Sequence, residues 1–142
     1  MALNNLLVAV DDSEGSRKAV DLAVDIATPN PDAHVDVAYV VNIPLLNESQ
    51  SVNFKDILDM MMDDGKQLLE DVVAGMGDVA DRAEGLLLTG VSPATELVKL
   101  IEQRNYDLVI IGNRGLSGVQ EYMGSVSHKV LHGSTAPVLI AK

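Results

Sequence analysis

The stretch that decides the fold is Leu108-Val109-Ile110-Ile111-Gly112, which continues as Asn113-Arg114-Gly115-Leu116-Ser117-Gly118. Its short, continuously apolar first part predicts a buried strand, because a strand with one face in water would alternate apolar and polar side chains. Strands of this kind belong to parallel sheets that helices cover on both faces. The glycines that follow predict a loop leaving the carboxyl end of the strand.

Outward from this stretch, further strand-like runs alternate with segments of helical periodicity. Additional strands are predicted over residues 6–10, 35–41, 86–89 and 137–141. Helices are predicted to begin after a cap at Ser13 or Ser16, at residue 54, at Pro93 after the cap Ser92, and at Ser125, the last of them running to His132. In the long second helix, Gly65 is expected to cost roughly 1 kcal/mol relative to alanine.

This alternation predicts an α/β fold: one domain over residues 1–142, built as an open parallel five-stranded sheet flanked by helices. The composition, 47% hydrophobic and 22% charged, is close to that of ordinary globular domains and argues against disorder. Cysteine is absent, which removes disulfide frameworks and thiolate metal sites and fits a reducing compartment.

The net charge of the chain argues against two classes of binding partner. A net charge of −11 disfavours duplex nucleic acid and anionic membranes, since both are bound through lysine and arginine. No apolar run approaches the ~20 residues of a membrane span, and the N-terminus lacks the basic flank of a secretory signal, so we expect a cytoplasmic protein. All but one of the acidic residues precede residue 108, which leaves the last segment compatible with a small anionic ligand.

The loop after residue 111 is the first candidate for a binding site. Ligands of open parallel sheets bind beyond the carboxyl ends of the strands. Glycines let backbone N–H groups approach an anion closely, and Gly124-Ser125 opens a helix whose N–H groups and dipole favour phosphate. The hydroxyls of Ser125 and Ser127 add donors. Turn geometry alone is the competing interpretation of the glycines.

Two charged residues could complete such a site. Asp11 ends the first predicted strand, where a carboxylate can accept ribose hydroxyls or bind a magnesium ion that bridges phosphates. Its alternative role is to cap the next helix. Arg114 lies in the glycine-rich loop and could pair with phosphate through its planar guanidinium, or could simply be solvated.

These segments together resemble the universal stress protein family, from end to end. The loop resembles that of the nucleotide-binding subgroup: glycine, two residues, glycine, nine residues, then Gly-Ser or Gly-Thr. The corresponding residues here are Gly112, Gly115, Gly124 and Ser125, with eight residues instead of nine before Gly124. Further family-like segments are Val8-Ala9-Val10-Asp11, Gly90-Val91-Ser92-Pro93 and Ala136-Pro137-Val138-Leu139-Ile140.

The resemblance implies a Rossmann-like fold of the adenine nucleotide alpha hydrolase-like type and a non-enzymatic, nucleotide-binding regulator of the stress response. ATP, or AMP or ADP, would be the ligand, with Mg²⁺ at Asp11 and no catalytic residue. The adenine would lie near Val40 and Ala9, and a homodimer would form through Val138-Leu139-Ile140-Ala141. The implied nucleotide-binding set is Ala9, Val10, Asp11, Val40, Ile111, Gly112, Arg114, Gly115, Gly124, Ser125, Val126 and Ser127.

Two other functions remain open. A slow ATPase could use Arg114 and the start of the last helix to stabilise developing phosphoryl charge, although no general base is evident. A protein-interaction module would result if the shortened loop had lost its ligand.

Other families fit less well. A phosphoacceptor receiver domain would share the acidic pair Asp11-Asp12, but it needs an aspartate at the end of the third strand, where Leu86-Leu87-Leu88-Thr89-Gly90 stands. A dinucleotide-binding protein would have its glycine fingerprint after the first strand, but Asp11-Asp12-Ser13-Glu14 stands there. The chain has no Walker lysine motif, and the glycines around Ser117 lack the spacing of a nucleophile elbow.

The remaining candidates are interpreted structurally. His128 and His132 have a spacing that could hold zinc, but no third ligand is evident, so we expect them to face solvent. Met60-Met61-Met62 is expected to fill gaps in packing, and His34 indicates no chemistry.

Overall fold

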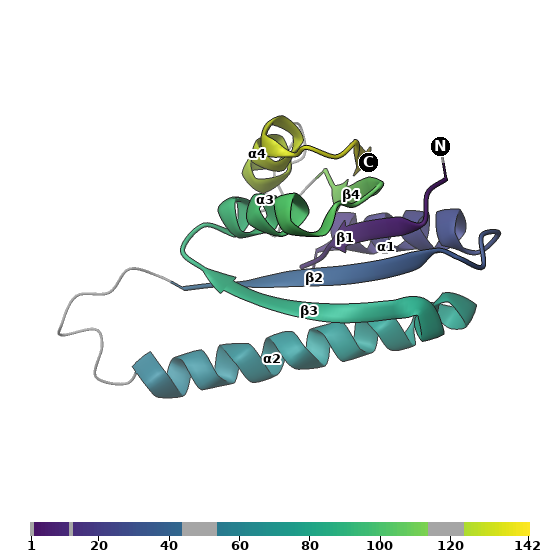
Figure 1. Cartoon of the computed structure of the whole chain (residues 1–142). Helices are drawn as coiled ribbons and strands as arrows, with labels where there is room; N and C mark the ends of the chain where they lie inside the picture. Colours follow the sequence, from purple (N-terminus) through teal and green to yellow (C-terminus); the bar gives the residue numbers. More distant parts are fainter. Residues whose placement is uncertain (1, 12, 44–53, 114–123) are drawn as a thin grey trace.

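The computed structural model describes residues 2–11, 13–43, 54–113 and 124–142. Five strands form one parallel sheet in the order β3-β2-β1-β4-β5, with helices between them along the chain (Figure 1). The predicted fold class is therefore confirmed. The elements are β1 (Asn5–Ala9), α1 (Glu14–Ala27), β2 (His34–Asn42), α2 (Phe54–Ala74), the 3-10 helix η2 (Gly77–Arg82), β3 (Ala83–Gly90), α3 (Pro93–Arg104), β4 (Leu108–Gly112), α4 (Ser125–Gly133) and β5 (Val138–Ala141).

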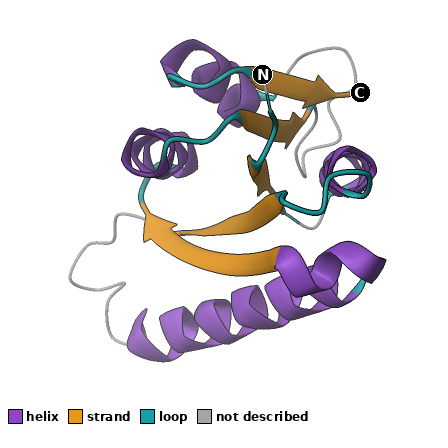
Figure 2. Ribbon diagram, turned by 45° about the vertical axis from the view of Figure 1, so that its right-hand side comes forward, coloured by secondary structure: helices purple, strands orange, loops and turns teal. Residues whose placement is uncertain are grey.

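Helices cover both faces of the sheet, as Figure 2 shows. Successive side chains of a strand point to opposite faces. On one face, Leu6 and Val8 of β1 pack with the alanines of α1 and with Leu69 of α2. On the other, Leu7 and neighbouring residues of β4 pack under α3 and α4. Because both faces are buried, most positions of β1 and β4 are apolar, as the predicted continuous runs required.

The edge strand β3 is longer than predicted. It begins at Ala83, three residues before the predicted start, because Ala83, Glu84 and Gly85 pair with β2 through the backbone although they form no apolar run. The 3-10 helix just before it was not predicted. Its last residue, Arg82, donates from Nη1 to the carbonyl oxygens of Asn30 and Ala33, both at 2.9 Å.

The helix starts follow their predicted caps. Of the two candidates for α1, Ser13 is the cap, and its Oγ accepts a hydrogen bond of 3.2 Å from the N–H of Ser16. Ser92 caps α3 with Pro93 in the first turn, which confirms that prediction.

Gly65 has a role that its helix propensity does not reveal. It is buried where α2 crosses the sheet, and a Cβ there would lie 2.8 Å from Cδ1 of Leu87 and 3.1 Å from the Tyr39 ring. The missing side chain lets α2 approach β2 and β3 closely. The expected cost in helix propensity is thus accompanied by a packing requirement.

The strand order creates a crevice. The chain moves outward from β1 through β2 to β3, then returns to the other side of β1 to form β4 and β5. The order reverses between β1 and β4, and their carboxyl ends lie at Ala9 and Gly112. Open α/β sheets bind ligands at such a switch point. Among the described residues, no helix is long and apolar enough to cross a membrane.

Candidate functional site

A cavity of about 440 Å³ opens at the carboxyl ends of β1, β2 and β4. Ten of the twelve predicted nucleotide-binding residues line it; the other two, Arg114 and Gly115, lie outside the described residues. The lining predicted residues are Ala9, Val10, Asp11, Val40, Ile111, Gly112, Gly124, Ser125, Val126 and Ser127. Residues from three strands, their following turns and one helix start thus converge on one space.

Asp11 stands at the turn from β1 into α1. Its Oδ1 accepts a 2.8 Å hydrogen bond from the N–H of Ser13, and its own N–H donates to Oγ of Ser16 at 2.9 Å. The carboxylate therefore helps to shape the start of α1, although Ser13 is the cap. The bond to Ser13 fixes its orientation and leaves further lone pairs for a hydroxyl or a cation.

The start of α4 forms another part of the cavity wall. Gly124 occupies the cap position and, having no side chain, provides no side-chain cap. The N–H groups of Ser125, Val126 and Ser127 belong to the first turn, which has no intrahelical acceptors. These donors and the helix dipole favour an anion at this wall.

The two serines of this turn differ. Ser127 is buried, and its Oγ donates to the carbonyl oxygen of Gly124 at 2.9 Å, so its hydroxyl proton is engaged within the helix. Ser125 is exposed. The hydroxyl of Ser125 could therefore donate to a ligand as predicted. Ser127 would contribute its backbone N–H instead of its hydroxyl.

Gly112 is required by packing rather than by anion approach alone. A Cβ on Gly112 would lie 2.6 Å from the carbonyl carbon of Gly15, so β4 contacts the first turn of α1 through bare backbone. This close approach brings the ends of β1 and β4 to the same cavity. The eight-residue interval before Gly124 lies outside the described residues. The described residues on either side of the stretch 114–123 are joined, because the N–H of Gly124 donates to the Asn113 carbonyl at 2.8 Å.

Part of the cavity lining was not predicted from the sequence. Asn42 ends β2 at the same edge of the sheet as Asp11. Its position directly after a predicted strand could have indicated that it lines the cavity. Met61 of α2 also reaches the cavity, so this methionine does more than fill a packing gap. The other unpredicted lining residues are Ser13, Ser16, Ala38, Tyr39, Pro93 and Leu97.

The cavity combines two chemical environments. Ala9, Val40, Ile111 and Leu97 give it apolar walls, whereas Asp11 and the first turn of α4 are polar. Ligand sites commonly pair an apolar surface with a few convergent polar groups. A flat apolar ring joined to an anionic group matches this division.

The sheet order and the crevice at its switch point define a doubly wound α/β protein of Rossmann-like architecture. Within that class, the chain belongs to the universal stress protein family, whose sequence profile matches residues 3–142. Universal stress protein YxiE of Bacillus subtilis is 32% identical over 148 aligned residues, covering 98% of this chain and 99% of that protein.

Solved structures show the same architecture. The universal stress protein UspA from Lactobacillus plantarum superposes with a TM-score of 0.89 at 20% identity, over 100% of this chain and 99% of its own. A universal stress protein in complex with cAMP is 26% identical with a TM-score of 0.64, over 99% and 97% of the two chains. A universal stress protein family protein from Arabidopsis thaliana with AMP bound has a TM-score of 0.72 at 20% identity, over 98% of this chain and 91% of its own. The universal stress protein from Archaeoglobus fulgidus in complex with dAMP has a TM-score of 0.62 at 19% identity, over 100% of both chains.

Proposed function

We propose that this protein binds ATP or a related adenine nucleotide and acts as a non-enzymatic, cytoplasmic regulator of the stress response. The observation that carries the proposal is the cavity at the switch point, which apolar side chains, Asp11 and the first turn of α4 line together. Related structures that hold cAMP, AMP and dAMP support an adenine nucleotide as the ligand.

In this proposal, each part of the nucleotide has its own place in the cavity. The adenine would pack against Ala9 and Val40, and the ribose hydroxyls would bind Asp11. The phosphates would accept hydrogen bonds from the first turn of α4. The phosphate-binding residues in this proposal are Gly112, Arg114, Gly115, Gly124, Ser125, Val126 and Ser127.

Magnesium fits this donor set only together with phosphate. Mg²⁺ is usually held by one or two carboxylates, substrate phosphates and several waters. Asp11 is the single carboxylate among the described residues that line the cavity. It would hold the ion while the phosphates supply the other oxygen ligands, and Mg²⁺ would supply charge neutralisation between them.

The non-enzymatic role also rests on the cavity lining. Hydrolysis requires a group that positions or activates water. Among the described lining residues, the one carboxylate with that capacity, Asp11, is oriented by the start of α1. We therefore propose that occupancy, rather than turnover, is the output of the protein.

Isothermal titration calorimetry with ATP, ADP, AMP and cAMP, each with and without Mg²⁺, tests this function. Asp11→Asn removes the charge at nearly constant size and should weaken Mg·ATP binding at least about tenfold, which corresponds to about 1.4 kcal/mol. Val40→Trp should block all four ligands by filling the adenine end of the cavity. Leu131→Trp, at a half-exposed position away from the lining, is the matched control and should bind normally.

Three results separate the alternatives. Flat traces with every nucleotide would refute binding and favour a protein-interaction module. Release of phosphate from ATP that disappears in Asp11→Asn would establish a slow ATPase instead. Saturable binding with no phosphate release is the expected result.

A further inference from the structure

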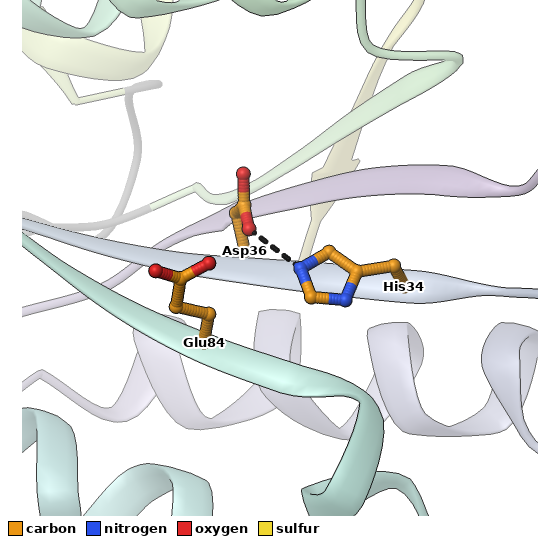
Figure 3. Close-up of side chains that lie close together, drawn as sticks. All are labelled: His34, Asp36 and Glu84. Carbon is orange, nitrogen blue, oxygen red and sulfur yellow. Dashed lines mark hydrogen bonds and ion pairs between the residues drawn. The ribbon is translucent and has the colours of Figure 1, made fainter.

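A second polar cluster lies at the opposite end of the sheet, where β2 begins. His34 and Asp36 are two residues apart on this strand and therefore point to the same face. Glu84 of the edge strand β3 is the direct partner of Asp36 in the strand register. Figure 3 shows the three side chains turned toward one another, with the His34 ring beside the Asp36 carboxylate.

Asp36 is the fixed centre of this cluster. Only 3% of the residue is exposed. Its Oδ2 accepts hydrogen bonds from Nη1 of Arg104 at 3.2 Å and from the Tyr106 hydroxyl at 2.5 Å. Burial, followed by the bond to Asp36, raises the pKa of Tyr106 above its ordinary value, which keeps the phenol a donor. Oδ1 is thereby directed toward Nε2 of His34, 2.9 Å away.

The charges of the cluster are not balanced by the protein. Two carboxylates stand directly opposite each other on neighbouring strands, an arrangement that is destabilising for like charges. Arg104 pairs with Asp36, and His34 is charged only when it is protonated. Counted with Arg104, the two carboxylates leave one negative charge before any contribution from His34, and a bound cation would offset it.

We propose that His34, Asp36 and Glu84 bind a divalent transition-metal ion, with zinc as the preferred ion. One ligand atom from each residue lies within 4.8 Å of the others. An imidazole nitrogen with two carboxylate oxygens is a zinc-type donor set, and three protein ligands leave a position for water. Glu84 is exposed, so its flexible side chain can close the remaining distance.

The groups behind Asp36 strengthen this assignment. Metal-binding carboxylates are usually held by hydrogen bonds from a second layer of residues. Arg104 and Tyr106 provide such bonds to Oδ2, so Oδ1 is the oxygen that would bind the ion, in place of its present hydrogen bond with Nε2 of His34. The half-exposed His34 side chain gives the ion access from solvent. The bound ion would cross-link β2 to the edge strand β3.

Titration of the EDTA-treated, nucleotide-free full chain with ZnCl₂, in competition with a chromophoric chelator, tests the proposal. Wild type should take up one equivalent of zinc. His34→Gln and Glu84→Gln change half-exposed or exposed side chains and should each weaken binding at least about tenfold. His132→Gln and Asp21→Asn, the latter on the exposed side of α1, should leave this affinity unchanged. The first control matters because the rings of His128 and His132 lie 4.5 Å apart on α4.

Thermal unfolding distinguishes a metal site from a simple ion pair. Zinc should raise the Tm of wild type but not that of Glu84→Gln, since a ligand stabilises the form that binds it. Without zinc, Glu84→Gln should be at least as stable as wild type because it removes a like-charge contact. The proposal is overturned if wild type takes up no stoichiometric zinc, or if uptake survives in His34→Gln and Glu84→Gln and is lost in a control variant. Neither result depends on nucleotide binding, which is measured at the other end of the sheet.

Discussion

At the scale of single residues, Gly112 is a position where two backbones meet. A Cβ there would lie 2.6 Å from the carbonyl carbon and oxygen of Gly15, and backbone atoms cannot rotate away as a side chain can. Gly112→Ala should therefore lower the free energy of unfolding by about 1–3 kcal/mol, the usual cost of overpacking. Urea denaturation at neutral pH measures the change.

Gly75→Ala is the matched control for this substitution. A Cβ on Gly75 would have its nearest contacts at 3.5 Å, an ordinary van der Waals distance. Its unfolding curve should stay within about 0.5 kcal/mol of wild type. Equal stability of the Gly112 and Gly75 variants would contradict the close approach of β4 and α1.

Tyr106 gives a second prediction at this scale. Tyr106→Phe removes a hydrogen bond to the buried Asp36 carboxylate and should cost about 1.5–3 kcal/mol at pH 7. Because the pKa of Tyr106 is raised in the folded state, its contribution is complete below the unfolded value of about 10 and declines as the pH rises above it.

The measurement is the difference in unfolding free energy between wild type and Tyr106→Phe, followed from pH 7 to above pH 10. The difference should be constant up to about pH 10 and shrink beyond it. Using the difference cancels the titration of the other tyrosines and the lysines. A gap that widened at high pH would show that the phenol is not held in its neutral form.

At the scale of elements, Arg82 joins η2 to the end of α1. Its Nη1 donates to the carbonyl oxygens of Ala27, Asn30 and Ala33, at 3.3, 2.9 and 2.9 Å. Arg82→Met should cost about 1–3 kcal/mol, because these carbonyls lose a charged donor. Urea unfolding should show this loss, whereas Arg17→Met on the exposed side of α1 should not.

The elements also show what the sequence could and could not predict. Strands β1 and β4 are buried on both faces, so their continuous apolar runs were enough to predict them. The first part of β3 has no such run, since an edge strand is held by backbone pairing, and its start was missed. In the cavity, lining residues at the ends of β1 and β4 were predicted. Asn42 at the end of β2 was not, and Met61 reaches the cavity from a helix distant in sequence.

His34 illustrates a different limit. Its spacing from Asp36 put both on one face of a strand, and that signal was present in the sequence. The pairing of Asp36 with Glu84, however, depends on strand register, and the contacts with Arg104 and Tyr106 depend on how α3 packs. Local patterns contain neither, because both are set by tertiary structure.

At the scale of the whole molecule, the sheet ends in β5, whose outer side no other described strand pairs with. Its residues Val138, Leu139 and Ile140 are only partly buried, and an unpaired apolar edge favours association. We propose a homodimer through this strand. Val138→Lys and Ile140→Lys should give monomers by light scattering, while Met60→Lys, at an exposed apolar position of α2, should leave the mass unchanged.

Circular dichroism keeps this test informative, because Val138 and Ile140 also contact the core. A variant that remains folded and has the mass of a monomer supports the proposed interface. Folded variants with the mass of a dimer would rule out β5 as the contact.

The backbone of Asn113 connects the start of α4, which lines the cavity, to this edge of the sheet. Its carbonyl accepts from the N–H of Gly124 and its own N–H donates to Ala141, each at 2.8 Å, so one residue anchors both the start of α4 and the end of β5. Nucleotide binding at α4 and dimerisation through β5 would therefore both involve the hydrogen bonds of Asn113. By thermodynamic linkage, a nucleotide that strengthens dimerisation by a given factor must itself be bound more tightly by the dimer, by the same factor.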